Sequence, residues 1–150
     1  MSELISIAET WDIPDLVRLL TLLFGQDIEF EPDPVKQAQG LDCIIRNREI
    51  GEILVLRQSD RIVGMVSILY SVSTALGGKV AILEDMIIDP LFRGRGFGSK
   101  LLKEAISFAQ KRNCLRITLL TDYNNQKAIR FYEKYLFTRS AMIPMRLVFD

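Results

Sequence analysis

The chain has 150 residues, with 19 Lys and Arg against 19 Asp and Glu, and it has no histidine. A formal charge of zero creates no overall field that would attract nucleic acid or an anionic membrane, so we expect neither as a partner. The lack of histidine excludes Ser-His-Asp and Cys-His catalysis and removes the commonest zinc ligand. The only cysteines, Cys43 and Cys114, predict no disulfide framework and no metal site.

Neither the start of the chain nor its apolar segments suggest export or membrane insertion. Met1–Leu4 has no basic segment followed by an apolar one, so we expect no signal peptide. No apolar run approaches the length of a membrane span. We therefore predict a cytoplasmic protein with one domain over residues 1–150.

Hydrophobic periodicity predicts the secondary structure in chain order. The first half is expected to contain a strand at 5–7, helices at 13–25 and 34–48, and strands at 53–57 and 61–70. The second half is expected to contain a strand at 79–88, helices at 99–112 and 124–135, and strands at 115–120, 137–140 and 145–149. The order β-α-α-β-β-β-α-β-α-β-β predicts an α/β fold with a mixed central sheet of about seven strands and helices on both faces.

A glycine-rich turn, Arg93-Gly94-Arg95-Gly96-Phe97-Gly98, lies between the strand at 79–88 and the amphipathic helix that follows. The first N–H groups of a helix have no internal partner, and the helix dipole adds partial positive charge there. Glycine lets an anion approach the backbone closely, and arginine side chains bind phosphate oxygens. The pattern therefore predicts a phosphate-binding turn, the alternative being a turn that only joins strand to helix.

Two nucleotide-binding motifs do not match this turn. A P-loop requires Gly-x4-Gly-Lys-Ser/Thr, which Gly94 to Lys100 does not provide. The Rossmann pattern requires a third glycine where Ser99 stands, and no following strand carries the acidic residue.

The segment Ile88-Asp89-Pro90-Leu91-Phe92-Arg93-Gly94-Arg95-Gly96-Phe97-Gly98 resembles the pyrophosphate signature of the GNAT (GCN5-related) N-acetyltransferase superfamily, Arg/Gln-x-x-Gly-x-Gly/Ala. A second segment, Asn125-Gln126-Lys127-Ala128-Ile129-Arg130-Phe131-Tyr132-Glu133-Lys134, resembles the Asn-x-x-Ala-x-x-Phe-Tyr-Glu-Lys helix of the same family. The expected order of elements also fits this family. One departure follows the second motif, where Tyr135-Leu136-Phe137 replaces the usual Leu-Gly-Phe.

The resemblance implies transfer of an acetyl group from acetyl-CoA, as co-substrate, to a primary amine by direct attack in a ternary complex. It implies that the backbone of Met86, Ile87 and Ile88 pairs with the pantetheine arm, and that Asn125 reaches the cofactor. Tyr132 would protonate the leaving thiolate as general acid. The CoA pyrophosphate would be held by Arg93, Gly94, Arg95, Gly96, Phe97, Gly98 and Ser99. For Tyr132 the alternative is a core aromatic, and for Asn125 a plain helix cap.

The amine must lose a proton before it attacks, because an ammonium ion has no lone pair. Glu84, on the strand just before the cofactor segment, is the candidate base, acting directly or through water. Strand alternation places its neighbour Asp85 on the opposite face. The alternative for Glu84 is a structural carboxylate within the sheet.

The resemblance implies a small-molecule or peptide amine as the acceptor. The acidic residues Asp27, Glu29, Glu31 and Asp33 lie between the first two helices, where they would favour a cationic acceptor; a merely solvated loop is the alternative. A rival function is a non-catalytic CoA-binding module, which would need neither Tyr132 nor Glu84. A homodimer formed through the closing strands is compatible with the sequence.

Overall fold

The computed structural model of the protein describes residues 3–150. The chain forms two compact units, the first up to Leu120 and the second from Thr121 to Asp150, and each is described by itself. The prediction of one domain over residues 1–150 stays a prediction. Among residues 3–150, no helix has the length and apolar character that a bilayer span would require.

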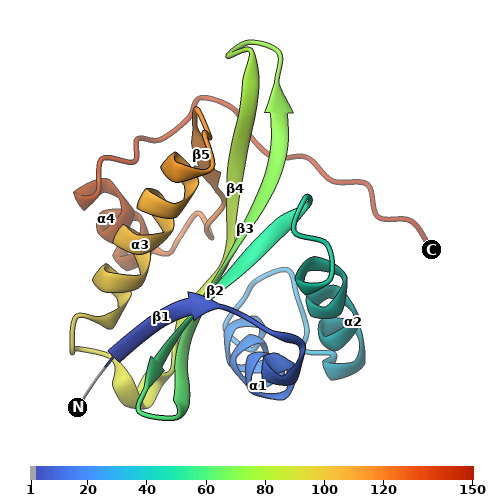
Figure 1. Cartoon of the computed structure of the whole chain (residues 1–150). Helices are drawn as coiled ribbons and strands as arrows, with labels where there is room; N and C mark the ends of the chain where they lie inside the picture. The colour runs from blue at the N-terminus through green and yellow to red at the C-terminus, as the bar shows by residue number, and fades with distance from the viewer. Residues whose placement is uncertain (1–2) are drawn as a thin grey trace. The chain divides into compact units, whose positions relative to one another are not determined.

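The first unit is built on a five-stranded sheet with the order β1-β2-β3-β4-β5 (Figure 1). The strands are β1 (Glu3–Ile7), β2 (Gly51–Gln58), β3 (Arg61–Ser73), β4 (Gly78–Ile88) and β5 (Ile117–Leu119). Neighbouring strands are antiparallel from β1 to β4, whereas β4 and β5 are parallel. The sheet is therefore mixed, as the sequence predicted.

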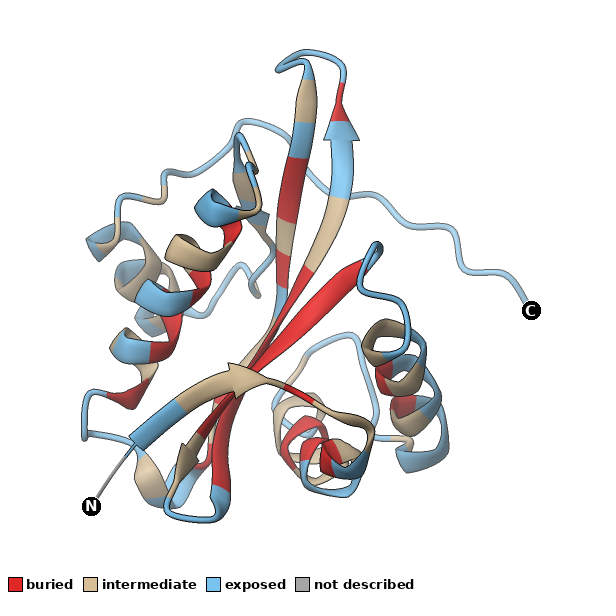
Figure 2. Ribbon diagram, viewed as in Figure 1, coloured by how far each residue is buried: buried red, intermediate tan, exposed pale blue. Residues whose placement is uncertain are grey.

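Helices cover both faces of this sheet. On one side lie α1 (Ile13–Phe24), preceded by the short 3-10 turn η1 (Thr10–Asp12), and α2 (Pro34–Ile45); on the other lies α3 (Phe97–Lys111) (Figure 1). The α1/α2 side forms one core cluster with the sheet, which includes Leu16, Leu19 and Leu41 from the helices and Met65 and Ile87 from the strands. Burial is concentrated in β2 and β3, as the red segments of Figure 2 show.

The predicted apolar stripe of α3 is confirmed. Leu101, Leu102, Ala105 and Ala109 are all buried, whereas Lys100, Lys103 and Glu104 are exposed. Spacings of three and four residues bring the apolar side chains to one face of a helix. This face packs on the sheet, since Leu101 lies beside Gly64 of β3.

The prediction of about seven strands is wrong, because five are present among the described residues. Residues 138–150 adopt no regular secondary structure, so the strands expected at 137–140 and 145–149 are not formed. Apolar side chains such as Met145, Leu147 and Phe149 are almost fully exposed there. A strand requires a partner for its backbone N–H and C=O groups, and apolar alternation alone does not supply one.

The second unit contains α4 (Gln126–Lys134), whose end shows how the chain compensates for the missing glycine. Leu136 adopts the left-handed conformation with φ 73°. Its N–H donates to the Glu133 carbonyl at 3.0 Å, and the Phe137 N–H donates to the Tyr132 carbonyl at 3.2 Å. These two bonds form a Schellman motif, and the Phe137 and Tyr132 rings meet with centroids 5.7 Å apart.

We expect Leu136→Gly to stabilise the protein by about 1 kcal/mol, because leucine is strained in the left-handed region and glycine is not. Leu136 is 90% exposed, so its side chain contributes little packing that would be lost. Urea unfolding of wild type and variant checks the prediction. The control is Leu136→Ala, which removes the same side chain but keeps the backbone strain; an equal gain in both variants would contradict the explanation.

Candidate active site

The glycine turn forms an exposed loop that ends at the N-terminus of α3. Gly94 and Gly96 have φ of 78° and 79°, which glycine adopts without strain. Gly96 is the N-cap residue, and no side chain caps this end of the helix. The first intrahelical bond runs from the Lys100 N–H to the Gly96 carbonyl, so the amides of residues 97–99 have no partner within the helix. This is the geometry of an anion-binding helix terminus.

The arginines of this turn are held near it by local contacts. The Arg93 Nε donates to the Ile88 carbonyl at 3.1 Å. The Arg95 guanidinium lies over the Phe92 ring, 5.1 Å from its centroid, and Arg61 of β3 lies 5.3 Å from the same centroid. Stacking on an aromatic face orients a guanidinium without removing its charge. The turn therefore carries positive side chains beside its exposed amides.

The backbone entering the turn is anchored by the buried residue Asp89. Its carboxylate accepts hydrogen bonds from the Leu91 N–H at 3.0 Å and from Arg18 Nη1 of α1 at 2.8 Å. Burial raises the pKa of Asp89, but these two bonds outweigh it and hold the pKa below its ordinary value. The ionised carboxylate thus fixes the 3-10 turn η2 (Pro90–Phe92) that leads into the glycines. This anchor could not be predicted from the sequence, because Arg18 lies 71 residues from Asp89 along the chain.

The end of β4 presents a strand edge beside the turn. The pairing of β4 with β5 stops at Leu83 and Leu119. Further along, Ile87 and Ile88 pair with β3 on one side, and no strand within residues 3–150 pairs with them on the other. On that side the backbone of Met86, Ile87 and Ile88 therefore has no strand partner, and the Ile88 carbonyl accepts the hydrogen bond from Arg93. Such an edge suits an extended ligand that adds itself as a strand.

A β-bulge interrupts β4 at the candidate base. Glu84 pairs with Ser67 and Ile87 pairs with Met65, so the segment between the two pairs is longer in β4 than in β3. Asp85 lies in this bulge with φ 54°, in the left-handed region. The predicted alternation of Glu84 and Asp85 across the sheet is interrupted here, because a bulge redirects side chains locally.

Asn125 and Tyr132 lie on α4 in the second unit. Asn125 Oδ1 accepts a hydrogen bond from the Ala128 N–H at 3.1 Å, so this side chain caps the helix, the alternative that the sequence left open. Burial raises the pKa of Tyr132 to about 12, so its hydroxyl is protonated at neutral pH. The ring of Tyr132 makes an edge contact with Phe131, with centroids 5.3 Å apart. The phenol is thus held rigidly in a form that can donate a proton.

The predicted site residues therefore fall into two groups. Glu84, the strand segment 86–88 and the turn 93–99 are consecutive parts of one strand–turn–helix in the first unit. Asn125 and Tyr132 are together on α4 in the second unit.

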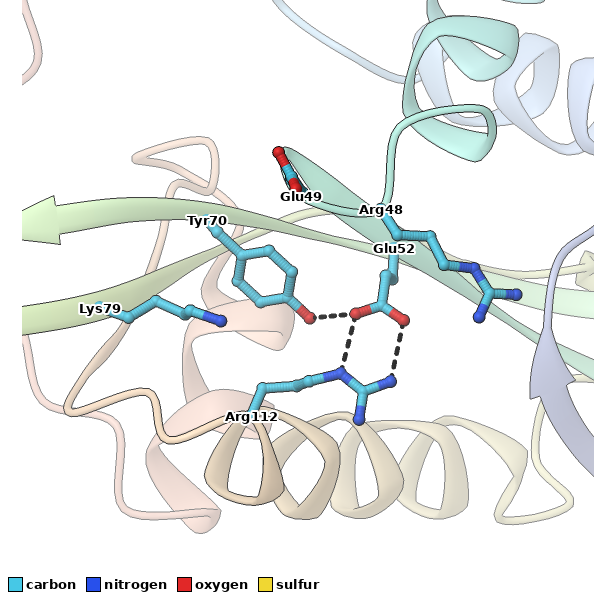
Figure 3. Close-up of a pocket in the computed structure, with 6 residues that line it drawn as sticks. All are labelled: Arg48, Glu49, Glu52, Tyr70, Lys79 and Arg112. Carbon is cyan, nitrogen blue, oxygen red and sulfur yellow. Dashed lines mark hydrogen bonds and ion pairs between the residues drawn. The ribbon is translucent and has the colours of Figure 1, made fainter.

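A buried polar cluster, found only in the structure, lines a cavity of about 270 Å³ on the face of the sheet where α3 ends (Figure 3). Glu52 of β2 accepts hydrogen bonds from the Tyr70 hydroxyl at 2.6 Å and from Arg112 Nε and Nη2 at 3.0 and 3.1 Å. Lys79 lies over the Tyr70 ring, 4.7 Å from its centroid. Burial raises the pKa of Glu52, and the bonds from Arg112 and Tyr70 lower it below its ordinary value. Because Glu52 is fully engaged, we assign this cluster to stability.

The bulged strand β4, its edge at residues 86–88 and the uncapped N-terminus of α3 thus follow one another along the chain. The sequence model of the acetyltransferase (GNAT) family matches residues 13–136. The chain belongs to this family, and its class of activity is that of an N-acetyltransferase.

Individual relatives support the same family with different named acceptors. The chain is 29% identical to a glucosamine 6-phosphate N-acetyltransferase of Trypanosoma brucei brucei, over 83% of this chain and 84% of the relative. It is 31% identical to thialysine N-epsilon-acetyltransferase of Mus musculus, over 47% of this chain and 39% of that protein. The crystal structure of a possible acetyltransferase from Clostridium difficile 630 shares the fold, with a TM-score of 0.87, 17% identity, and coverage of 99% and 100% of the two chains.

Proposed function

We propose that the protein transfers the acetyl group of acetyl-CoA to a primary amine by direct attack in a ternary complex. The observation that carries this proposal is the continuity of the bulged strand β4, its open edge at 86–88, and the uncapped N-terminus of α3. GNAT acetyltransferases use acetyl-CoA. A phosphate site and a strand edge joined by one short turn suit a ligand with a pyrophosphate and a peptide-like arm.

In this proposal the amides of residues 97–99 and the side chains of Arg93 and Arg95 bind the CoA pyrophosphate. The backbone of residues 86–88 pairs with the pantetheine arm, which directs the thioester toward the bulge. Asn125 would add a contact through its amide nitrogen, since its oxygen already caps α4. Positioning of the two reactants accounts for much of the acceleration in such a direct transfer.

The chemistry requires one proton acceptor and one proton donor. The acceptor nitrogen loses a proton to a carboxylate at the bulge, where Glu84 and Asp85 are adjacent. The nitrogen then attacks the thioester carbonyl carbon, the C–N bond forms and the C–S bond breaks. The departing thiolate takes the proton of the Tyr132 hydroxyl, which burial keeps protonated, and the second proton of the amide nitrogen returns to the Tyr132 oxygen.

The test is CoA release with an acceptor panel, combined with thermal unfolding. The panel contains 1,5-diaminopentane and lysine amide as cationic acceptors, thialysine, and glucosamine 6-phosphate as an anionic one. We expect acetyl-CoA to raise Tm, ATP and NAD to raise it little, and at least one amine to give acceptor-dependent thiol release. Binding of acetyl-CoA without release on any amine would instead support the rival function, a CoA-binding regulatory module.

A further inference from the structure

The bulge of β4 faces the side of the sheet that α1 and α2 cover. Met65 and Ile87 are paired across the strands and both belong to the α1/α2 core. Ser67 lies two residues beyond Met65 on β3, so it shares this face, and its cross-strand partner Glu84 shares it too. In a regular strand, residues three apart point to opposite faces. Glu84 and Ile87 lie on the same face because the bulge adds one residue between them.

The charges of two other carboxylates act on Asp85 at the bulge. Asp85 is half-buried, and burial together with the charges of Glu84 and Asp27 raises its pKa to about 6. Asp27, whose charge acts on Asp85, belongs to the loop between α1 and α2. Arg18, the basic side chain of α1 on this side, is already bonded to Asp89 and to the Ile62 carbonyl. The charges acting on Asp85 are thus negative on both sides.

A buried hydroxyl without a partner lies next to these carboxylates. Ser67 is 1% exposed, and within residues 3–150 its Oγ makes no hydrogen bond. Directly opposed residues of antiparallel strands have Cβ atoms about 4.5–5.5 Å apart, so Ser67 and Glu84 are neighbours. An unpaired buried hydroxyl destabilises a fold, and a ligand with N–H donors would satisfy it.

Asp85 also has a strained backbone. Its φ of 54° lies in the left-handed region, which asparagine and aspartate tolerate better than most residues. Like-charge repulsion, backbone strain and an unpaired hydroxyl all oppose stability at one place, a combination that is typical of functional sites. Within residues 3–150 no group of three acidic, cysteine or histidine side chains is arranged to hold a metal ion. The negative charges at Asp85 and the unpaired Ser67 hydroxyl suit a cationic ligand that carries N–H donors.

We infer that the acceptor binds as an ammonium ion at the β4 bulge, between Asp27, Glu84 and Asp85 and over Ser67, and that Asp85 takes its proton. This inference rests on the proposed function and assigns the base to Asp85 instead of Glu84. One proton leaves the ammonium nitrogen for an Asp85 carboxylate oxygen, and the freed lone pair attacks the thioester carbon. As the C–S bond breaks, the thiolate takes the proton of Tyr132, and the Tyr132 oxygen recovers the second proton of the amide nitrogen. The acceptor class is a cationic amine, such as a diamine or a lysine-like side chain, and a phosphorylated amino sugar is disfavoured by the same charges.

The protonation properties of Asp85 suit this role. A base whose pKa lies near 6 is ionised at neutral pH and is still basic enough to accept a proton. The sign for stability follows from its raised pKa: the folded protein binds the proton more tightly than the unfolded chain, so Asp85 lowers stability as pH rises from 4 to 6. Asp85→Asn is therefore expected to fold and to have a higher Tm than wild type at pH 7.

The experiment compares Asp85→Asn with Glu84→Gln, using 1,5-diaminopentane and acetyl-CoA. We expect Asp85→Asn to lower kcat/KM at least about 100-fold at pH 7 and to abolish the rise of kcat/KM with a midpoint near pH 6. Glu84→Gln should raise KM by about 10-fold and keep that pH profile, because it removes attraction but not the base. Ser67→Ala should raise both KM and Tm, whereas a purely structural serine would leave KM unchanged.

The outcomes separate this inference from the proposed function. The assignment of Asp85 as the base would be overturned if kcat/KM of Asp85→Asn stays within about threefold of wild type and still rises with pH near 6. The proposed acetyl transfer would then still stand. A preference for glucosamine 6-phosphate over the diamine would overturn the cation site. If the wild-type protein releases no CoA with any amine, calorimetry with CoA present tests diamine binding directly. Diamine binding that Glu84→Gln weakens at least about tenfold would support the cation site. If the wild-type protein does not bind the diamine, the cation site is rejected.

Discussion

Replacing Tyr132 by phenylalanine is expected to lower kcat by about 100- to 1,000-fold, the effect of removing a general acid. The hydroxyl is the donor that we propose for the departing thiolate, and burial raises the pKa of Tyr132 to about 12, so it carries its proton at neutral pH. The aromatic contacts with Phe131 and Phe137 do not involve this hydroxyl. The variant should therefore keep its fold and its affinity for acetyl-CoA.

The matched control is Tyr135→Phe, which removes a hydroxyl from the C-cap of the same helix. Its ring also contacts Phe131, with centroids 5.5 Å apart, so both variants preserve packing. Single-turnover CoA release with saturating acceptor measures the chemical step in each. A kcat of Tyr132→Phe within about threefold of the Tyr135→Phe value would show that this phenol is not the acid.

The largest effect on stability is expected for Arg112→Met. Glu52 has a side chain only 3% exposed, and Arg112 supplies two of its three hydrogen bonds (Figure 3). Methionine keeps much of the apolar stem but leaves the carboxylate without its counter-ion. Breaking such a pair costs about 3 kcal/mol, the lower end of the usual range, because Arg112 itself is 39% exposed.

Urea unfolding at pH 7 checks this value, and two further variants test its cause. Arg46→Met breaks an exposed pair with Asp42 and should change stability by less than about 0.5 kcal/mol. Adding Glu52→Gln to Arg112→Met should recover most of the loss, since the amide oxygen still accepts from Tyr70 and no buried charge remains. Equal losses in Arg112→Met and the double variant would indicate lost packing in place of an uncompensated charge.

The pH dependence of the same pair has a definite sign. The pKa of Glu52 lies below its ordinary value of 4.5 in the folded protein, so its contribution is present above pH 4.5 and lost as pH falls through the folded pKa. Arg112→Met removes the hydrogen bonds and the charge of Arg112, which lower this pKa, and leaves the Tyr70 hydrogen bond. The difference in unfolding free energy between wild type and variant should therefore shrink as the solution is acidified below pH 4.5, and a constant difference would contradict the assignment.

The parts of the fold that the sequence predicted well depend on interactions between near neighbours. The stripe of α3 and the capping of α4 by Asn125 depend on spacings of three and four residues. Strand pairing is different, because it depends on a partner that is distant in sequence. Alternating apolar residues at 145–149 matched a strand pattern, but within residues 3–150 no strand pairs with them.

The glycine-arginine turn and the Phe-Tyr helix motif were determined by the sequence alone, because backbone conformation and helix caps are local properties, although α3 begins at Phe97 and not at residue 99 as predicted. Tertiary structure decided what surrounds them. The bulge opposite Ser67, the charge of Asp27 that acts on Asp85, and the pairing of Asp89 with Arg18 all join residues far apart in the chain. Burial and the field of distant charges set the protonation of a carboxylate, and both arise only once the chain has folded.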